Sequence, residues 1–176
     1  MTLGLGLPFL PSVKRKVFVS YHHDRDQYYY DQFVSAFDEF WDVVTDGSLD
    51  RALDSDDADY VMRRIRERYV TGTSCTLVFC GVETPLRKYV DWEIKATLDK
   101  QHGLVGVWLP GTPQGANGGV SKPDRLQDNV DSGYAVWTDW LSVTSSPQSL
   151  LAAIEDANAR AKYLIANSRP MRRRNG

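Results

Sequence analysis

The chain has 176 residues, a length that favours one domain with its own hydrophobic core. Hydrophobic residues make up 42% of it and charged residues 25%, which is ordinary globular composition and argues against disorder and against a fibrous architecture. The formal net charge of −2 gives no long-range attraction for a phosphate backbone. Composition therefore argues against general nucleic-acid binding and favours small-molecule or protein partners.

The amino-terminal residues and the cysteines bear on location. Residues 1–14 are apolar but lack the basic start of a signal peptide and are too short to span a bilayer, so we expect a flexible leader and no membrane partner. Cys75 and Cys80 share one strand-like run, in which extended chain would separate them by roughly 16 Å. That separation is too long for a disulfide. Two reduced, buried thiols indicate a cytoplasmic protein.

Strand and helix patterns alternate along the chain from residue 16 onward. Short runs of β-branched and aromatic residues predict five strands of a buried sheet. Between them, apolar residues spaced three and four apart predict amphipathic helices. In chain order we predict a strand at 16–21, a helix at 27–40, a strand at 41–45, a helix at 55–69 with Ser55 as its N-cap, a strand at 75–80, a helix at 84–102, strands at 104–109 and 134–137, and a helix at 146–164.

Two further segments lack either pattern. Residues 110–130 are rich in Gly and Pro and predict a mobile surface loop, and residues 169–176 form a basic tail that we expect to be solvated. Residues 15–168 predict a single domain. Alternating strands and helices imply parallel pairing with right-handed crossovers. The predicted fold class is therefore α/β and flavodoxin-like, with three layers: a five-stranded parallel sheet and helices on both faces.

Polar residues gather beyond the carboxyl ends of two predicted strands, where ligands bind in this kind of fold. One cluster follows the first strand at 20–26, and another follows the third strand at 81–84 and leads into the helix that carries Glu93. The contiguous polar run after the first strand lacks the spacing of metal ligands, so we predict no metal site there.

Two stretches near these clusters resemble TIR domains. VFVSYHHD resembles the opening TIR strand, an aliphatic run followed by Ser-Tyr, and RKYVDWE resembles the TIR pattern Ser-x-Trp-Cys-x-x-Glu. Arg87, Tyr89, Val90 and Glu93 occupy the four defined positions of that pattern, with Arg87 in place of serine and Tyr89 in place of tryptophan. The longer stretch GTSCTLVFCGVETPLRKYVDWEI is similar to the TIR-like branch of the Thoeris anti-phage defence family. The Pro-Gly loop that follows the second strand in many TIR domains is missing.

The resemblance implies an enzyme that takes NAD+ as its substrate, with no cofactor and no metal, and builds a cyclic or conjugated ADP-ribose signal for anti-phage defence. Glu93 is the catalytic residue that it implies. A single carboxylate suits this chemistry, because nicotinamide is already a cationic leaving group and only the oxocarbenium-like ribose needs stabilising. The implied partners are a phage-derived activator and a downstream effector reached through the small molecule. The implied substrate-binding residues are Ser20, Tyr21, His22, Asp24, Gly81, Glu83 and Tyr89.

The candidate residues and the proposed activity also have simpler interpretations. Glu93 has the local pattern of a solvated helix carboxylate paired with a nearby lysine or arginine, and Glu83 can cap the helix that follows it. Asp24 or Asp26 can cap the helix after the first strand. The rival function is a non-catalytic TIR-type module that binds a protein partner. A receiver-like Mg²⁺ pocket would need a lysine after the last strand, and Trp137-Thr138-Asp139 offers none.

Overall fold

The computed structural model describes residues 14–45 and 57–176, and the predicted leader and the predicted cap at Ser55 lie outside these ranges. Five strands form one parallel sheet in the order β2-β1-β3-β4-β5. The strands are β1 (Arg15–Ser20), β2 (Trp41–Val44), β3 (Thr73–Cys80), β4 (Gly103–Trp108) and β5 (Val136–Asp139). The helical elements are α1 (Gln27–Phe37), α3 (Ala58–Arg64), η1 (Ile65–Val70), η2 (Thr84–Leu86), α4 (Lys88–Asp99), α5 (Asp124–Asp131), α6 (Trp140–Thr144), α7 (Pro147–Ala159) and η3 (Lys162–Leu164).

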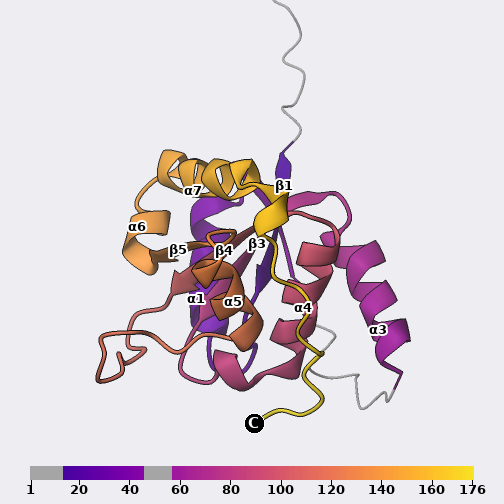
Figure 1. Cartoon of the computed structure of the whole chain (residues 1–176). Helices are drawn as coiled ribbons and strands as arrows, with labels where there is room; N and C mark the ends of the chain where they lie inside the picture. Colours follow the sequence, from indigo (N-terminus) through magenta and orange to yellow (C-terminus); the bar gives the residue numbers. More distant parts are fainter. Residues whose placement is uncertain (1–13, 46–56) are drawn as a thin grey trace, which may run out of the picture.

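Helices cover both faces of the sheet, as the sequence predicts (Figure 1). Alternate side chains of each strand point to opposite faces. On one face, residues such as Val19 and Leu77 pack with α1, α6 and α7. On the other face, residues such as Val78 and Leu104 pack with α4 and α5, and a third cluster joins α3 and η1 to α4. The predicted flavodoxin-like α/β fold is confirmed.

Several predicted boundaries are wrong. The predicted loop at 110–130 contains helix α5, whose buried residues include the polar Arg125 and Asn129 and so make no apolar stripe in the sequence. Strand β5 begins two residues later than predicted, because Tyr134 packs into the α4-side cluster and donates a hydrogen bond to the His102 carbonyl at 2.7 Å. The short helix α6 follows it unpredicted, and the last helix ends at Ala159.

The predicted basic tail is exposed at Arg169, Pro170 and residues 173–176, but it is docked on the domain and not free. Residues 169–176 lie along α4 (Figure 1, yellow). The Trp92 indole donates a hydrogen bond to the Arg172 carbonyl at 2.8 Å, and Met171 packs against the cluster between α3 and α4. A segment without regular secondary structure can pack on a helix only where its backbone N–H and C=O groups form hydrogen bonds. The tail forms such hydrogen bonds with α4.

Two expectations from composition concern the thiols and the membrane. Cys75 and Cys80 are both free and buried, as predicted. Within residues 14–45 and 57–176, none of the helices combines the length and the apolar character that crossing a bilayer would require.

Candidate functional site

The sheet order brings the ends of β1 and β3 together. From β1 the chain passes through α1 to β2, toward one edge of the sheet, and from β3 it passes through α4 to β4, toward the other edge. The strand order therefore reverses between the neighbours β1 and β3. In open α/β sheets, the crevice at such a reversal is where ligands bind. The polar segments at 20–26 and 81–87 both begin there, and the candidate site is built from them and from α4.

Glu93 and Ser20 form the centre of this site. Ser20 alternates with Val19 and Tyr21, which face α1, so its side chain faces α4. Glu93 lies in the second turn of α4, and the Ser20 hydroxyl donates a hydrogen bond to its Oε2 atom. Only 3% of Glu93 is exposed. It is therefore not the solvated helix carboxylate of the simpler interpretation, since it lies in the protein interior at the carboxyl end of β1.

Glu83 holds a group of basic side chains beside this centre. Its carboxylate accepts a hydrogen bond from Arg87 Nη2 at 2.5 Å and lies 3.2 Å from Arg25 Nη2. The hydrogen bond from Arg87, together with the nearby charges of Arg25 and Arg87, lowers the pKa of Glu83 below its ordinary value. The Glu83 side chain makes no capping hydrogen bond, so the cap interpretation is wrong.

His22 joins the same group from the loop that follows β1. It is 6% exposed, and its Nδ1 atom accepts a hydrogen bond from the Asp24 backbone at 3.2 Å. The neutral imidazole therefore carries its hydrogen on Nε2. That atom lies 3.3 Å from Glu83 Oε2, at an angle that does not make a hydrogen bond. An incoming polar group could meet Nε2 without breaking an existing hydrogen bond.

Asp26 ties the two segments together. Its carboxylate accepts a hydrogen bond from the Thr84 hydroxyl at 3.1 Å, and the same hydroxyl accepts one from the Gly81 backbone at 2.9 Å. Gly81 has to lack a side chain, because a Cβ atom there would collide with the Asp26 carboxylate. Burial raises the pKa of Asp26, while the hydrogen bond from Thr84 opposes that rise. Asp26 precedes α1 but makes no side-chain cap, so it serves the crevice and not the helix.

Three predicted substrate-binding residues lie apart from this group. Tyr21 points to the opposite face, where it stacks on Tyr30 and donates a hydrogen bond to Gln27 at 2.8 Å, and burial raises its phenol pKa. Asp24 is exposed on the turn. Tyr89 packs edge-on against Trp92 beside the cluster with α3. Tyr21 thus packs on the face of β1 opposite to the one from which Ser20 meets Glu93.

The structure adds Arg25, Asp26, Thr84 and Arg87 to the predicted residues. Each stood in the polar runs of the sequence, but only the fold shows that they converge on Glu83 and Gly81. Arg87 was visible as a departure from the TIR pattern. In the described part of the chain, no group of His, Cys, Asp and Glu side chains is arranged to hold a metal ion.

Comparison with known proteins agrees with this geometry. The family described as Thoeris protein ThsB, TIR-like domain, matches residues 18–114, more than half of the chain. The chain belongs to this family. The matched span includes Ser20, Glu83 and Glu93, and so covers all three parts of the candidate site. Membership in the Thoeris TIR-like family assigns the chain a TIR-domain signalling role in defence.

The chain was also compared with curated proteins and with solved structures. No curated protein matches the chain. Among solved structures, it aligns with the TIR domains in the structure of the activated Roq1 resistosome directly recognising the pathogen effector XopQ. The alignment covers 84% of this chain and 86% of that chain, at 12% sequence identity and a TM-score of 0.39.

Proposed function

We propose that this Thoeris TIR-like protein cleaves the bond between nicotinamide and ribose in NAD+, with Glu93 as its catalytic carboxylate. The observation that carries the proposal is the buried position of Glu93, hydrogen-bonded to Ser20 at the carboxyl end of β1. Burying a carboxylate costs free energy because the charge loses its solvation. Carboxylates buried in this way are concentrated at functional sites. Family membership supplies the context for that use.

The chemistry needs charge stabilisation more than proton transfer. As the glycosidic bond breaks, its electron pair goes to the nicotinamide nitrogen, which becomes neutral, and positive charge develops on the ribose. A fixed carboxylate in a site of low dielectric constant offsets that charge more strongly than water does. The Ser20 hydrogen bond fixes the orientation of the Glu93 carboxylate before substrate arrives. Ser20 therefore acts on the reaction through Glu93.

The nucleophile that takes the ribose cation decides the product. Water gives ADP-ribose and a hydroxyl of the same molecule gives a cyclic ADP-ribose, and each of these nucleophiles loses its proton as the new bond forms. A ring nitrogen of the same molecule also gives a cyclic ADP-ribose, but it attacks through its lone pair and has no proton of its own to lose. A nucleophile that is held in place has an effective concentration of roughly 10⁵ M or more. A signalling role in defence favours the cyclic or conjugated product, which a downstream effector can recognise.

Arg25 and Arg87 supply positive charge for the diphosphate of NAD+. Glu83 holds both guanidinium groups beside the carboxyl ends of β1 and β3. Arg87 is the extended residue just before α4 and Glu93 lies in the second turn of that helix, so both belong to the same end of α4. The guanidinium groups bind the phosphate oxygens, as arginine commonly does. His22, Gly81 and Glu83 keep the substrate-binding role that the sequence analysis gave them.

Incubation of the purified chain with NAD+, followed by mass spectrometry of the small molecules, tests this function. Release of nicotinamide together with an ADP-ribose product, alone or after addition of extract from phage-infected cells, is the expected result. The extract supplies the phage-derived activator that we propose. Absence of turnover under both conditions, together with stable self-association or capture of a protein partner, would favour the non-catalytic signalling module.

A further inference from the structure

The C-terminal strap, defined as residues 167–176, lies along the length of α4 and runs in the opposite direction. It begins beside the last turn of the helix and ends beside η2, the segment that leads into the first turn (Figure 1). Its hydrogen bonds with α4 and η2 include Asn167 Nδ2 to Asp99 Oδ1 at 2.8 Å, Arg172 N to Asp91 Oδ2 at 2.8 Å, Trp92 Nε1 to Arg172 O at 2.8 Å, Lys88 N to Asn175 Oδ1 at 2.9 Å and Gly176 N to Leu86 O at 3.0 Å.

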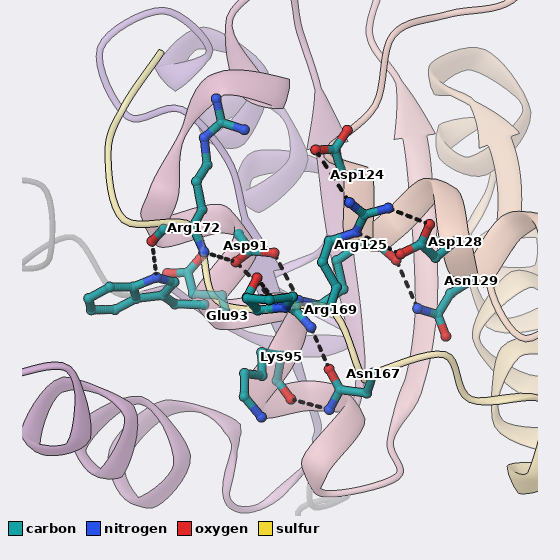
Figure 2. Close-up of polar contacts among 12 residues, drawn as sticks. Asp91, Glu93, Lys95, Asp124, Arg125, Asp128, Asn129, Asn167, Arg169 and Arg172 are labelled. Atoms are coloured by element: carbon teal, nitrogen blue, oxygen red, sulfur yellow. Dashed lines mark hydrogen bonds and ion pairs between the residues drawn. The ribbon is translucent and has the colours of Figure 1, made fainter.

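A buried ion pair joins this strap to α4 and α5. Arg125 of α5 has no exposed surface, and its guanidinium donates to both oxygens of Asp91, at 2.8 and 3.3 Å. The same guanidinium donates to Asn167 Oδ1 at 2.9 Å (Figure 2). It also donates to the Pro170 carbonyl at 3.2 Å. A buried charge that loses one of its partners costs several kcal/mol, so the three elements keep one arrangement.

Arg169 adds a second attachment of the strap to α5. Its Nε and Nη2 atoms donate to the two carboxylate oxygens of Asp128, each at 2.8 Å (Figure 2). Such a two-point contact fixes the direction of the guanidinium as well as its position. The strap is thus held on the side of α4 that faces away from Ser20.

Asp91 and Glu93 lie two residues apart on α4 and point to different sides of it. Asp91 meets Arg125 and the strap, whereas Glu93 meets Ser20 on β1. The helix is therefore fixed at both sides, and any rotation about its axis that loosens Asp91 also moves the Glu93 carboxylate. A displacement of about 1 Å in a catalytic group can cost about 100-fold in rate.

We propose that the strap, acting through Asp91 and Arg125, positions Glu93 for catalysis. This inference rests on the proposed NAD+ cleavage. Asp91 and Arg125 are positioning residues, because they touch the helix that carries the carboxylate and not the reacting atoms. Displacement of the strap leaves the sheet and its core intact, lets α4 turn or shift, and lowers the rate of bond cleavage while the diphosphate contacts of the substrate remain.

Substitution of one strap residue in the full-length chain tests the proposal. Met171→Asp puts a charge against the cluster between α3 and α4 and displaces the strap, whereas Ser168→Asp adds the same charge at an exposed position of the same segment. Asn175→Ala is the milder variant, which only removes the acceptor for the Lys88 backbone. The measurements are kcat and KM for nicotinamide release, well below each melting temperature, and amide hydrogen exchange across α4.

The expected result for Met171→Asp is a fall in kcat of at least 10-fold with KM for NAD+ little changed, together with faster exchange of the α4 amides. Asn175→Ala shows the same pattern with a fall of about 3-fold, and Ser168→Asp matches the wild type. Faster exchange with an unchanged kcat in both strap variants would show a purely structural role and overturn the proposal, and so would an unchanged exchange rate. A wild-type chain that releases no nicotinamide contradicts the proposed function itself, and the positioning role with it.

Discussion

At the scale of single residues, the site depends on the contact between Ser20 and Glu93. The alternation of side chains along β1 turns Ser20 toward α4, and α4 turns Glu93 toward the end of β1. Both side chains are buried, so their hydrogen bond is protected from exchange with water. Loss of that bond leaves the carboxylate in place but free to adopt other orientations.

Ser20→Ala is therefore expected to lower kcat for nicotinamide release about 10-fold, which corresponds to about 1.4 kcal/mol, with little change in KM. Alanine fits the buried position and leaves only a small void. Ser142→Ala is the matched control, because it also removes a serine hydrogen bond to a carboxylate, at the exposed start of α6. A kcat equal to that of the control would mean that Ser20 does not orient Glu93.

Asp26 gives a prediction for stability as a function of pH. Its pKa is raised by burial, so the ionised side chain is less favourable in the folded chain than in the unfolded one. Wild-type stability is therefore lowered as pH rises from the ordinary aspartate range through the raised pKa, and it stays lowered above it. Asp26→Asn removes this penalty and keeps an oxygen for Thr84, so the variant is more stable than the wild type at pH 7.

Urea unfolding at several pH values measures this difference. The advantage of Asp26→Asn is expected to shrink as pH falls toward 4, where the wild-type carboxyl becomes protonated. Asp24→Asn, on the exposed turn two residues earlier, is expected to leave stability unchanged. An Asp26→Asn variant that is less stable than the wild type at pH 7 would mean that the negative charge itself stabilises the crevice.

The residue scale also shows how much of the site the sequence reveals. Glu93 was accessible through its motif, although its local pattern was that of a surface carboxylate. Tyr21 and Ser20 lie on opposite faces because adjacent positions on a strand point to opposite sides, and a motif that spans both does not say which face carries the site. The partners of Glu83 include His22, from the loop after β1, and Arg87, just before α4, so no single local pattern could show them together.

At the scale of elements, the least predictable parts are α5 and the strap. Helix α5 has a charged residue, Arg125, at a position where an amphipathic pattern would show an apolar one. Arg125 is buried because it pairs with Asp91, which lies 34 positions earlier in the chain and so is invisible to a local pattern. The basic residues of the strap likewise indicate a solvated tail, because their partners on α4 and α5 lie far away in the sequence. Local periodicity predicts which face of a helix is apolar, but it does not predict which distant carboxylate will form an ion pair with a residue of that helix.

The close packing of β4 against β5 gives a prediction at this scale. A Cβ atom at Gly106 would lie 2.6 Å from the Trp137 ring and 3.0 Å from Leu126. Gly106→Ala is therefore expected to lower the free energy of unfolding by about 1–3 kcal/mol, measured by urea unfolding. Gly115→Ala is the control, since a Cβ atom there meets its nearest neighbour at 3.3 Å on an exposed loop. Equal stability of the two variants would show that the Trp137 ring moves aside at no cost.

At the scale of the whole molecule, the alternation of strands and helices was enough to predict a parallel sheet covered on both faces. The sheet order then determines which loops meet, and it is the neighbouring position of β1 and β3 that joins two polar runs about 60 residues apart in the sequence. Membership in the Thoeris TIR-like family agrees with this architecture. Fold and site location follow from patterns along the chain, whereas the orientation of each side chain follows from packing.

The rate of nicotinamide release by Glu93→Gln tests the central claim most directly. Glutamine keeps the size of the side chain and an oxygen for Ser20, so the variant is expected to fold normally and to release nicotinamide at least about 100-fold more slowly than the wild type. Glu155→Gln is the matched control on α7, where an exposed carboxylate only pairs with Arg15, and it is expected to retain the full rate. A folded Glu93→Gln chain that works within twofold of the wild-type rate would contradict the account.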